Sequence, residues 1–226
     1  MRKLGRLIEK DHRDIMFAMK PQKASSDLTY KFWYTSPAYD QGRTSQCVAY
    51  SGIKYLDTGP IRNRDFDVKK HFSFTDLYMD CQRNDAWDGE EYDGTSVRAL
   101  FKILKRDGYV DRYEWAFDLA TVVNHVLTTG PVVMGTWWTE DMFDVDDRGF
   151  IHATGSPAGG HAYLLKGVNK GTWCPDGSRG AFRIINSWGN WGQNGCASIS
   201  FNDLEALLLS DGEACAAHEV QLLQKY

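Results

Sequence analysis

The sequence predicts an α+β protein with two lobes, because its two halves differ in hydrophobic periodicity. In the first half, apolar residues recur at three- and four-residue intervals, which is typical of amphipathic helices. In the second half, short apolar or alternating runs are separated by Gly-rich turns, which is typical of strands. We therefore expect one domain, 1–226, with an N-terminal arm of about 1–36, a helical lobe of about 37–118 and a β-rich lobe of about 119–226.

Four helices are expected in the first half and at its end. Three of them place apolar residues on one face, and Gly or Pro residues follow each of these three as stop signals. The expected helices are Gln46–Leu56, Thr75–Cys81, Ser96–Arg106 and Leu119–Leu127. Residues up to about Ser36 show no sustained period, so we expect an irregular arm that lies across the body.

Five strands are expected after the Gly130–Pro131 break. They are short runs of apolar residues bounded by Gly-containing turns. The expected strands are Val132–Gly135, His161–Val168, Ala181–Asn186, Ala197–Phe201 and Glu219–Leu223.

The composition argues against several classes of function. The chain is 42% hydrophobic and its formal charge is -4, so it is too apolar for disorder and has no overall basic field to attract nucleic acid. No apolar stretch is long enough to span a membrane, and the charged N-terminus lacks the apolar centre of a signal peptide. The 5 cysteines fit neither a disulfide framework nor a zinc site. We expect a cytoplasmic protein with no nucleic acid, membrane or metal partner.

Three separate motifs supply the groups that a cysteine nucleophile needs. Cys47 in DQGRTSQCVAY opens the first expected helix, where the helix dipole and exposed amides favour a thiolate. His161 in GGHAYLLKGV begins an expected strand and can accept the thiol proton. Asn186 in IINSWGNWGQNG ends another strand and can orient the imidazole by a hydrogen bond. A lone cysteine in a helix is more often a core residue, but these surroundings favour a nucleophile.

Further residues of the same motifs are suited to contact a substrate. Gln41 lies shortly before Cys47, and Gly42 permits a bend that would let the Gln41 amide and the Cys47 backbone amide converge as an oxyanion hole. Gly160 lets backbone approach a ligand closely beside the imidazole. Trp188 can cover the bond between the imidazole and the amide and exclude water.

These motifs resemble those of the papain-like cysteine peptidases of the C1 type. DQGRTSQCVAY looks like the family's nucleophile signature, GGHAYLLKGV like its His strand, and NSWGNWGQNG like its most specific motif. The similarity spans nearly the whole chain, and DGTSVRALFKILKRDGYV further resembles bacterial and phage-encoded members. The resemblance implies a papain-like two-lobed fold, in which a helical lobe and an antiparallel β-barrel-like lobe enclose the active site in the cleft between them.

The resemblance also implies roles for individual residues. The catalytic residues that it implies are Cys47, His161, Asn186 and Gln41. YDGTS is similar to the wall that binds substrate backbone, which adds Gly94 to Gly160 and Trp188 as substrate-binding residues. The implied activity is hydrolysis of peptide bonds in a peptide or protein substrate, through a Cys thiolate and an acyl-enzyme, without a cofactor.

Two alternatives stay open at this point. One is a papain-fold hydrolase acting on peptidoglycan amide bonds, as an amidase or endopeptidase, and the other is a catalytically silent binding or virion-associated module. The spacing of Gln41 and the NSWG motif favour the peptidase, and the presence of all four catalytic residues favours an enzyme. The likeness to phage-encoded members adds phage structural proteins as candidate partners and the virion as a candidate location.

The segment before Cys47 raises the question of how activity is restrained. Only 46 residues precede Cys47, fewer than the inhibitory pro-domain of many papain-like peptidases. We therefore do not expect activation by removal of a pro-domain. One candidate for the restraint is the N-terminal arm, Met1–Lys31, lying in or near the cleft.

Overall fold

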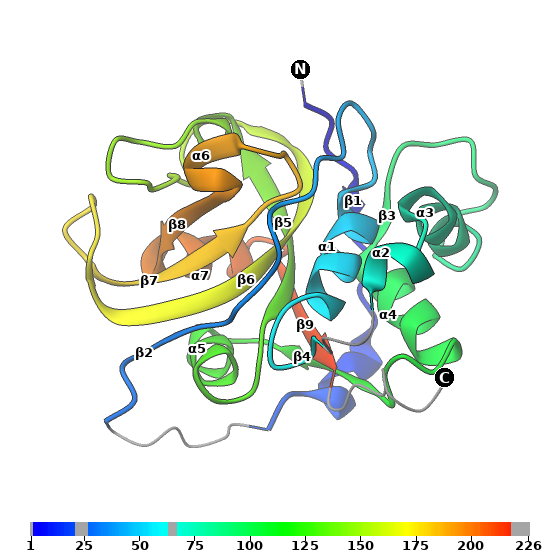
Figure 1. Cartoon of the computed structure of the whole chain (residues 1–226), viewed down its shortest axis with the longest axis horizontal. Helices are drawn as coiled ribbons and strands as arrows, with labels where there is room; N and C mark the ends of the chain where they lie inside the picture. Colours follow the sequence, from blue (N-terminus) through cyan, green and yellow to red (C-terminus); the bar gives the residue numbers. More distant parts are fainter. Residues whose placement is uncertain (1, 21–26, 63–66, 218–226) are drawn as a thin grey trace.

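A helical lobe and a sheet lobe lie side by side in the computed structural model, which describes residues 2–20, 27–62 and 67–217. Figure 1 shows the helices of the first half on one side and the antiparallel sheet on the other. The predicted α+β class with two lobes is therefore confirmed. Every helix in the described residues is too short or too polar to cross a lipid bilayer.

The helical lobe is centred on a helix that is buried along almost its whole length. Its helices are α1 (Cys47–Leu56), α2 (Val68–His71), α3 (Phe74–Gln82) and α4 (Val97–Arg106). Gly52 lets α1 approach α4 closely, because a Cβ at this position would lie 2.4 Å from Leu100 Cδ1. Ser96 caps α4 by accepting a hydrogen bond from the Ala99 amide. α1 is thereby fixed with its first residue facing the other lobe.

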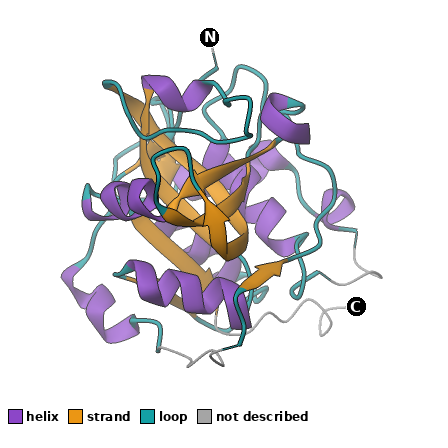
Figure 2. Ribbon diagram, turned by 90° about the vertical axis from the view of Figure 1, so that its left-hand side faces the viewer, coloured by secondary structure: helices purple, strands orange, loops and turns teal. Residues whose placement is uncertain are grey.

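The sheet lobe contains one antiparallel sheet with the strand order β4-β9-β5-β6-β7-β8, and β2 pairs with β6 at the side. Its strands are β2 (Tyr30–Phe32), β4 (Tyr113–Ala116), β5 (Val132–Thr139), β6 (Pro157–Trp173), β7 (Arg179–Ile185), β8 (Cys196–Ser200) and β9 (Glu213–Ala217). The predicted antiparallel, barrel-like lobe is therefore present, and within the described residues its strand order is an open path and not a closed barrel. In Figure 2 the strands lie at the centre with helices around them.

The remaining elements lie around the sheet and in the arm, except β3, which belongs to the helical lobe. They are α5 (Leu119–Thr128), η2 (Glu140–Phe143), α6 (Trp191–Asn194) and α7 (Phe201–Leu209), together with β1 (Arg6–Leu7), η1 (His12–Phe17) and β3 (Thr95–Ser96). The arm is therefore partly regular, although the sequence predicted an irregular one. Its residues 1 and 21–26 lie outside the described residues.

The four predicted helices are confirmed to within one residue at each end. Four of the five predicted strands are also confirmed, and β6 extends well beyond its prediction in both directions. The fifth, Glu219–Leu223, lies outside the described residues. The sequence missed β9, because its residues EACAA are small and show little alternation.

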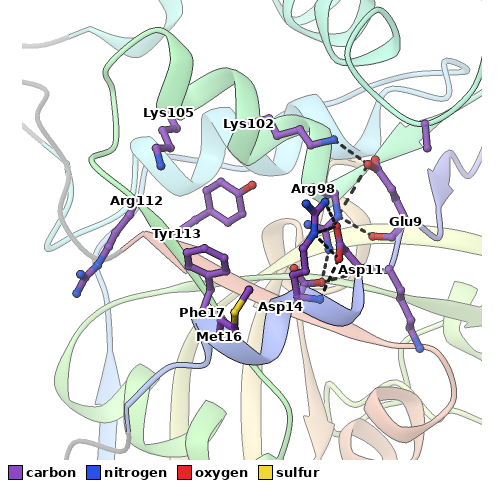
Figure 3. A pocket seen from close by; sticks show the side chains of 13 residues that line it. Glu9, Asp11, Asp14, Met16, Phe17, Arg98, Lys102, Lys105, Arg112 and Tyr113 are labelled. Carbon is purple, nitrogen blue, oxygen red and sulfur yellow. Dashed lines mark hydrogen bonds and ion pairs between the residues drawn. The ribbon is translucent and has the colours of Figure 1, made fainter.

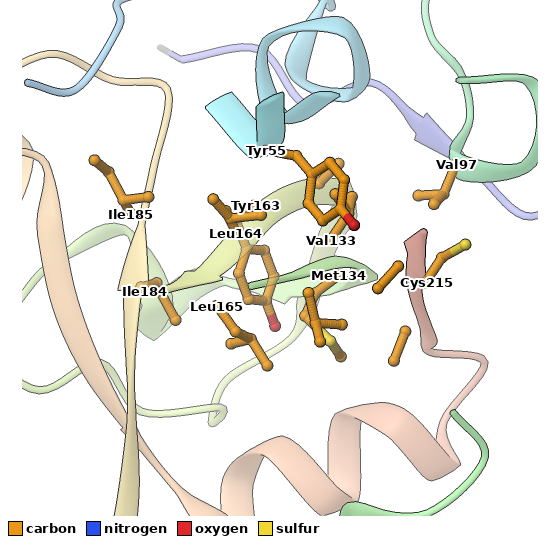
Figure 4. Close-up of a cluster of buried hydrophobic side chains, with 14 of the residues drawn as sticks. Tyr55, Val97, Val133, Met134, Tyr163, Leu164, Leu165, Ile184, Ile185 and Cys215 are labelled. Atoms are coloured by element: carbon orange, nitrogen blue, oxygen red, sulfur yellow. The ribbon is translucent and has the colours of Figure 1, made fainter. Parts of the chain in front are cut away.

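A continuous core that includes Cys47 joins the two lobes. Figure 4 shows Tyr55 of α1 packed over β5 and β6, with Cys215 of β9 beside them. The Ala217 amide donates a 2.7 Å hydrogen bond to Tyr55 Oη, which ties α1 to the last described strand. This buried contact fixes the position of α1 relative to the sheet.

Candidate active site

Cys47 is the first residue of α1 and is fully buried. Burial raises the pKa of its thiol to about 11, although nearby backbone amides, those of Ala162 and Gly5 foremost, oppose this rise. Ala162 directly follows His161 in β6, so strand and helix bring the thiol and the imidazole to one place. The thiol is protonated at neutral pH in this state.

His161 is fully buried, and its hydrogen bonds define which ring nitrogen is free. Its Nε2 lies 2.8 Å from Asn186 Oδ1, and the same oxygen accepts the Ser187 amide at 2.8 Å. A backbone amide can only donate, so the bond from the Ser187 amide shows that the Asn186 atom is its oxygen, Oδ1. Oδ1 can only accept, so His161 Nε2 must carry the proton of their hydrogen bond. Among the described residues Nδ1 has no hydrogen-bond partner, so its lone pair is available to accept a proton.

The surroundings of the imidazole keep it neutral. Trp188 stacks on the ring with centroids 4.7 Å apart, and Trp138 packs edge-on at 4.8 Å. Burial lowers the pKa of His161 to about 4, and the hydrogen bond to Asn186 opposes this only in part. Trp188 is itself fully buried, so the structure places this predicted substrate-binding residue against the imidazole. The sequence predicted Trp188 both as a cover over the bond between His161 and Asn186 and as a substrate-binding residue.

Gln41 is held by Ser187, a residue that the sequence analysis did not single out. The Gln41 amide donates to Ser187 O at 2.8 Å, and Ser187 Oγ donates to Gln41 Oε1 at 2.5 Å. These contacts orient the carboxamide so that Nε2 donates to Thr44 O at 2.6 Å and to Lys3 O at 3.1 Å. Gln41 Nε2 therefore donates to a backbone carbonyl of the N-terminal arm. Ser187 could have been found from its place inside the NSWG motif.

The cleft itself is occupied by the N-terminal segment Arg2–Leu7, which Figure 1 shows in blue beside α1 and β3. The Gly5 amide donates to Gly160 O at 3.0 Å, and the Thr95 amide donates to Gly5 O at 2.9 Å. The segment thus bridges β6 of one lobe and β3 of the other. The expectation that the arm lies in or near the cleft is met by Arg2–Leu7.

Glycines permit this close approach on both sides. A Cβ on Gly5 would lie 2.0 Å from Ser45 O, and a Cβ on Gly160 would lie 2.0 Å from Arg6 O. Gly94 has φ +109°, and its Cβ would lie 2.6 Å from Gly5 O. The two glycines predicted to bind substrate, Gly94 and Gly160, therefore both contact backbone of the protein's own chain.

Glu9 and Asp14, which follow the segment Arg2–Leu7 in the arm, bind side chains of α4, as Figure 3 shows. Lys102 Nζ donates to Glu9 at 2.8 Å, and Ser96 Oγ donates to the other oxygen of this carboxylate. Arg98 donates to Glu9 O at 3.0 Å and forms an ion pair with Asp14. These contacts hold the arm in place where it leaves the cleft.

Within the described residues no group of His, Cys, Asp or Glu side chains is arranged to hold a metal ion. The 5 cysteines all lie in this part of the chain, and each is buried and free. Cys47 differs from the other four in opening a helix beside an oriented histidine.

The solved structures that resemble this chain include several cysteine proteases. Xylellain, a cysteine protease from Xylella fastidiosa, has a TM-score of 0.66 at 16% identity, and the match covers 96% of both chains. The chain adopts the papain-like fold. Digestive procathepsin L2 from the Tenebrio molitor larval midgut has a TM-score of 0.63 at 16% identity, covering 96% of this chain and 78% of that one.

A third similar structure contains the cysteine protease and lectin-like domains of a surface layer associated protein of Clostridium difficile. It has a TM-score of 0.57 at 19% identity, and the match covers 83% of this chain and 50% of that one. No family model and no curated protein matches the sequence. At these identities the likeness establishes the fold.

Proposed function

We propose that this protein is a cysteine peptidase that hydrolyses peptide bonds through an acyl-enzyme. Cys47 Sγ attacks the substrate carbonyl, and His161 Nδ1 accepts the thiol proton and returns it to the leaving amine. Water then attacks the thioester, which releases the acid and restores the thiol. Gln41 Nε2 and the Cys47 amide donate hydrogen bonds to the oxyanion in both steps.

The observation that carries this proposal is the orientation of His161. Its Nε2 donates to Asn186 Oδ1 at 2.8 Å, while Nδ1 is buried and has no partner among the described residues. A histidine that served only the core would be expected to use both nitrogens, because an unsatisfied buried polar atom is costly. An acceptor nitrogen left free on the residue before Ala162, whose amide faces the Cys47 thiol, suits a general base.

The occupied cleft explains why the pair is neutral in this state. The segment Arg2–Leu7 excludes water, and desolvation disfavours both the thiolate and the imidazolium. Catalysis therefore requires the segment to leave before a substrate can enter. The Lys3 carbonyl, which accepts from Gln41 Nε2 at 3.1 Å, occupies the place that the proposal gives to the substrate oxyanion.

Alkylation of the thiol provides the test. The full-length protein is incubated with an epoxysuccinyl peptide, and intact mass is measured over time. We expect one adduct in the wild type and in Cys81→Ala, which removes another buried thiol, and none in Cys47→Ala. His161→Ala should form the adduct about 100-fold more slowly, since it lacks the base.

Two results would contradict the proposal. One is an adduct that persists in Cys47→Ala, and the other is a wild type whose rate is unaffected by His161→Ala. Hydrolysis is then measured on a peptide library and on purified peptidoglycan. Clearing of peptidoglycan without cleavage of peptides would favour a cell-wall hydrolase.

A further inference from the structure

The side chain of Arg6 fills a buried pocket formed by Glu213, Asp211 and Gly135, one residue along the arm from Gly5. Arg6 follows Gly5, whose amide contributes to the environment of Cys47, and its side chain is 0% exposed. Arg6 Nε donates to Glu213 Oε2 at 3.0 Å and Nη2 donates to the same oxygen at 2.7 Å. Nη2 also donates to Asp211 O at 2.6 Å. Two acceptors therefore converge on one guanidinium.

The strand register explains why this pocket adjoins the active site. Glu213 opens β9 and lies opposite Gly135 in β5, and Gly135 lies opposite Ala162, the residue after His161, in β6. Gly135 leaves the space that the arginine needs, because a Cβ there would lie 2.9 Å from both Arg6 Nε and Val97 Cγ2. The wall of the pocket is thus shaped around an arginine side chain.

We propose that this pocket is a specificity site of the peptidase and that Glu213 makes it select an arginine side chain in the substrate. The inference rests on the proposed function. In the described structure the pocket holds Arg6 because the segment Arg2–Leu7 occupies the cleft as a bound peptide would. Glu213 is only 5% exposed with Arg6 in place, so a substrate side chain that replaces Arg6 and again excludes water would leave the carboxylate in need of a counter-charge.

The geometry favours arginine over other side chains. A guanidinium presents five N–H donors in a fixed fork, and its Nε and Nη2 donors meet the Glu213 carboxylate and the Asp211 carbonyl. Nη1 is buried without a partner among the described residues. Lysine would supply the charge without the fork. An uncharged side chain would bury the Glu213 carboxylate without a counter-charge, so a site of this kind should discriminate strongly against it.

A structural anchor is the competing explanation, in which the Arg6–Glu213 pair only fastens the arm. The two explanations differ in what the emptied pocket does. Both explanations allow the emptied pocket to bind a free guanidinium, but only a specificity pocket changes which peptide is cleaved. The experiment therefore empties the pocket in the full-length chain with Arg6→Ala and compares this variant with Arg6→Ala/Glu213→Gln, in which the carboxylate is also neutralised.

The first measurement is binding of agmatine, a small guanidinium compound, followed by thermal unfolding. We expect saturating agmatine to raise the Tm of Arg6→Ala by about 3 °C and to leave the Tm of Arg6→Ala/Glu213→Gln unchanged. Butylamine, which lacks the guanidinium fork, should have a smaller effect. Equal responses of the two variants to agmatine would overturn the assignment of the pocket.

The second measurement is cleavage of fluorogenic peptides in which one arginine is moved through the three residues before the scissile bond. Matched peptides carry citrulline, which has the shape of arginine without its charge. At one position we expect kcat/KM for arginine to exceed that for citrulline by about 100-fold in Arg6→Ala, and by less than about threefold in Arg6→Ala/Glu213→Gln. Equal cleavage of both peptides by Arg6→Ala would refute the proposal.

The two measurements separate this inference from the proposed function. If no peptide is cleaved and Cys47 is not alkylated, the peptidase proposal fails, and the response to agmatine alone decides whether the pocket binds a guanidinium. If Arg6→Ala does not fold, the peptides are compared on the wild type. There the segment competes equally with every peptide, so the ratio of arginine to citrulline cleavage is preserved.

Discussion

Replacing Gly5 with alanine should open the cleft. A Cβ at this position would lie 2.0 Å from Ser45 O and 2.6 Å from Ser45 C, distances that a side chain cannot adopt without movement of the backbone. Ser45 lies in the loop that leads into α1, so we expect the segment Arg2–Leu7 to move rather than the loop. The displacement would break the hydrogen bonds from Gly5 to Gly160 and from Thr95 to Gly5.

The size of the effect follows from these contacts. Each backbone hydrogen bond contributes about 1 kcal/mol net, and the bond between Gln41 and Lys3 would be lost as well. A loss of about 2–3 kcal/mol of docking energy corresponds to an increase of about 30- to 150-fold in the fraction of open molecules. If the thiol reacts only in open molecules, its rate of alkylation should rise by the same factor.

The assay is the rate of adduct formation with the epoxysuccinyl peptide, measured by intact mass for the wild type and Gly5→Ala. Gly177→Ala is the matched control, because Gly177 has no atom within 4 Å of an added Cβ and its φ of +80° makes the substitution mildly destabilising. The control should react at the wild-type rate. An unchanged or reduced rate in Gly5→Ala would refute the idea that the segment is what blocks the thiol.

Three further outcomes are expected. Asn186→Ala should slow alkylation of Cys47 by at least about tenfold, because nothing then fixes the proton on His161 Nε2, and a wild-type rate would contradict this role. Gln41→Ala should lower kcat by about 100-fold with little change in KM in peptide hydrolysis, and a change in KM alone would point to substrate binding instead. Unfolded His161 binds a proton between the ordinary His pKa near 6.5 and about 4 while folded His161 does not, so His161 should lower the free energy of unfolding by about 3 kcal/mol over this window as pH falls, and His125, whose pKa burial also lowers to about 4, adds its own share. Urea unfolding at pH 7 and pH 4 checks this. Between these two pH values the free energy of unfolding should fall by about 3 kcal/mol less in His161→Gln than in the wild type. Equal decreases in the two proteins would contradict the lowered pKa of His161.

Much of the candidate site could be predicted from the sequence because its parts lie in short motifs with local signals. A helix start at Cys47 and a strand containing His161 follow from periodicity and from flanking glycines. Each motif also brings its own neighbours, such as Ser187 and Trp188 beside Asn186. The order of these motifs was enough to propose a single site before any contact was known.

The specificity pocket could not be predicted in the same way. Glu213 begins a strand of small residues without clear alternation, and Arg6 lies in an arm without a period. Their contact depends on the register of three strands and joins residues 207 positions apart in the sequence, which no local pattern encodes.

The covered thiol has a chemical consequence beyond the control of substrate entry. Oxidation by peroxides proceeds through the thiolate and requires access to the sulfur. Cys47 is protonated at neutral pH and fully buried while Gly5 lies over it, so both requirements are withheld at once. Sulfur chemistry that would destroy the nucleophile is slowed for as long as the first residues of the chain stay in place. The segment Arg2–Leu7 thus both protects the Cys47 thiol from oxidation and keeps substrate away from it.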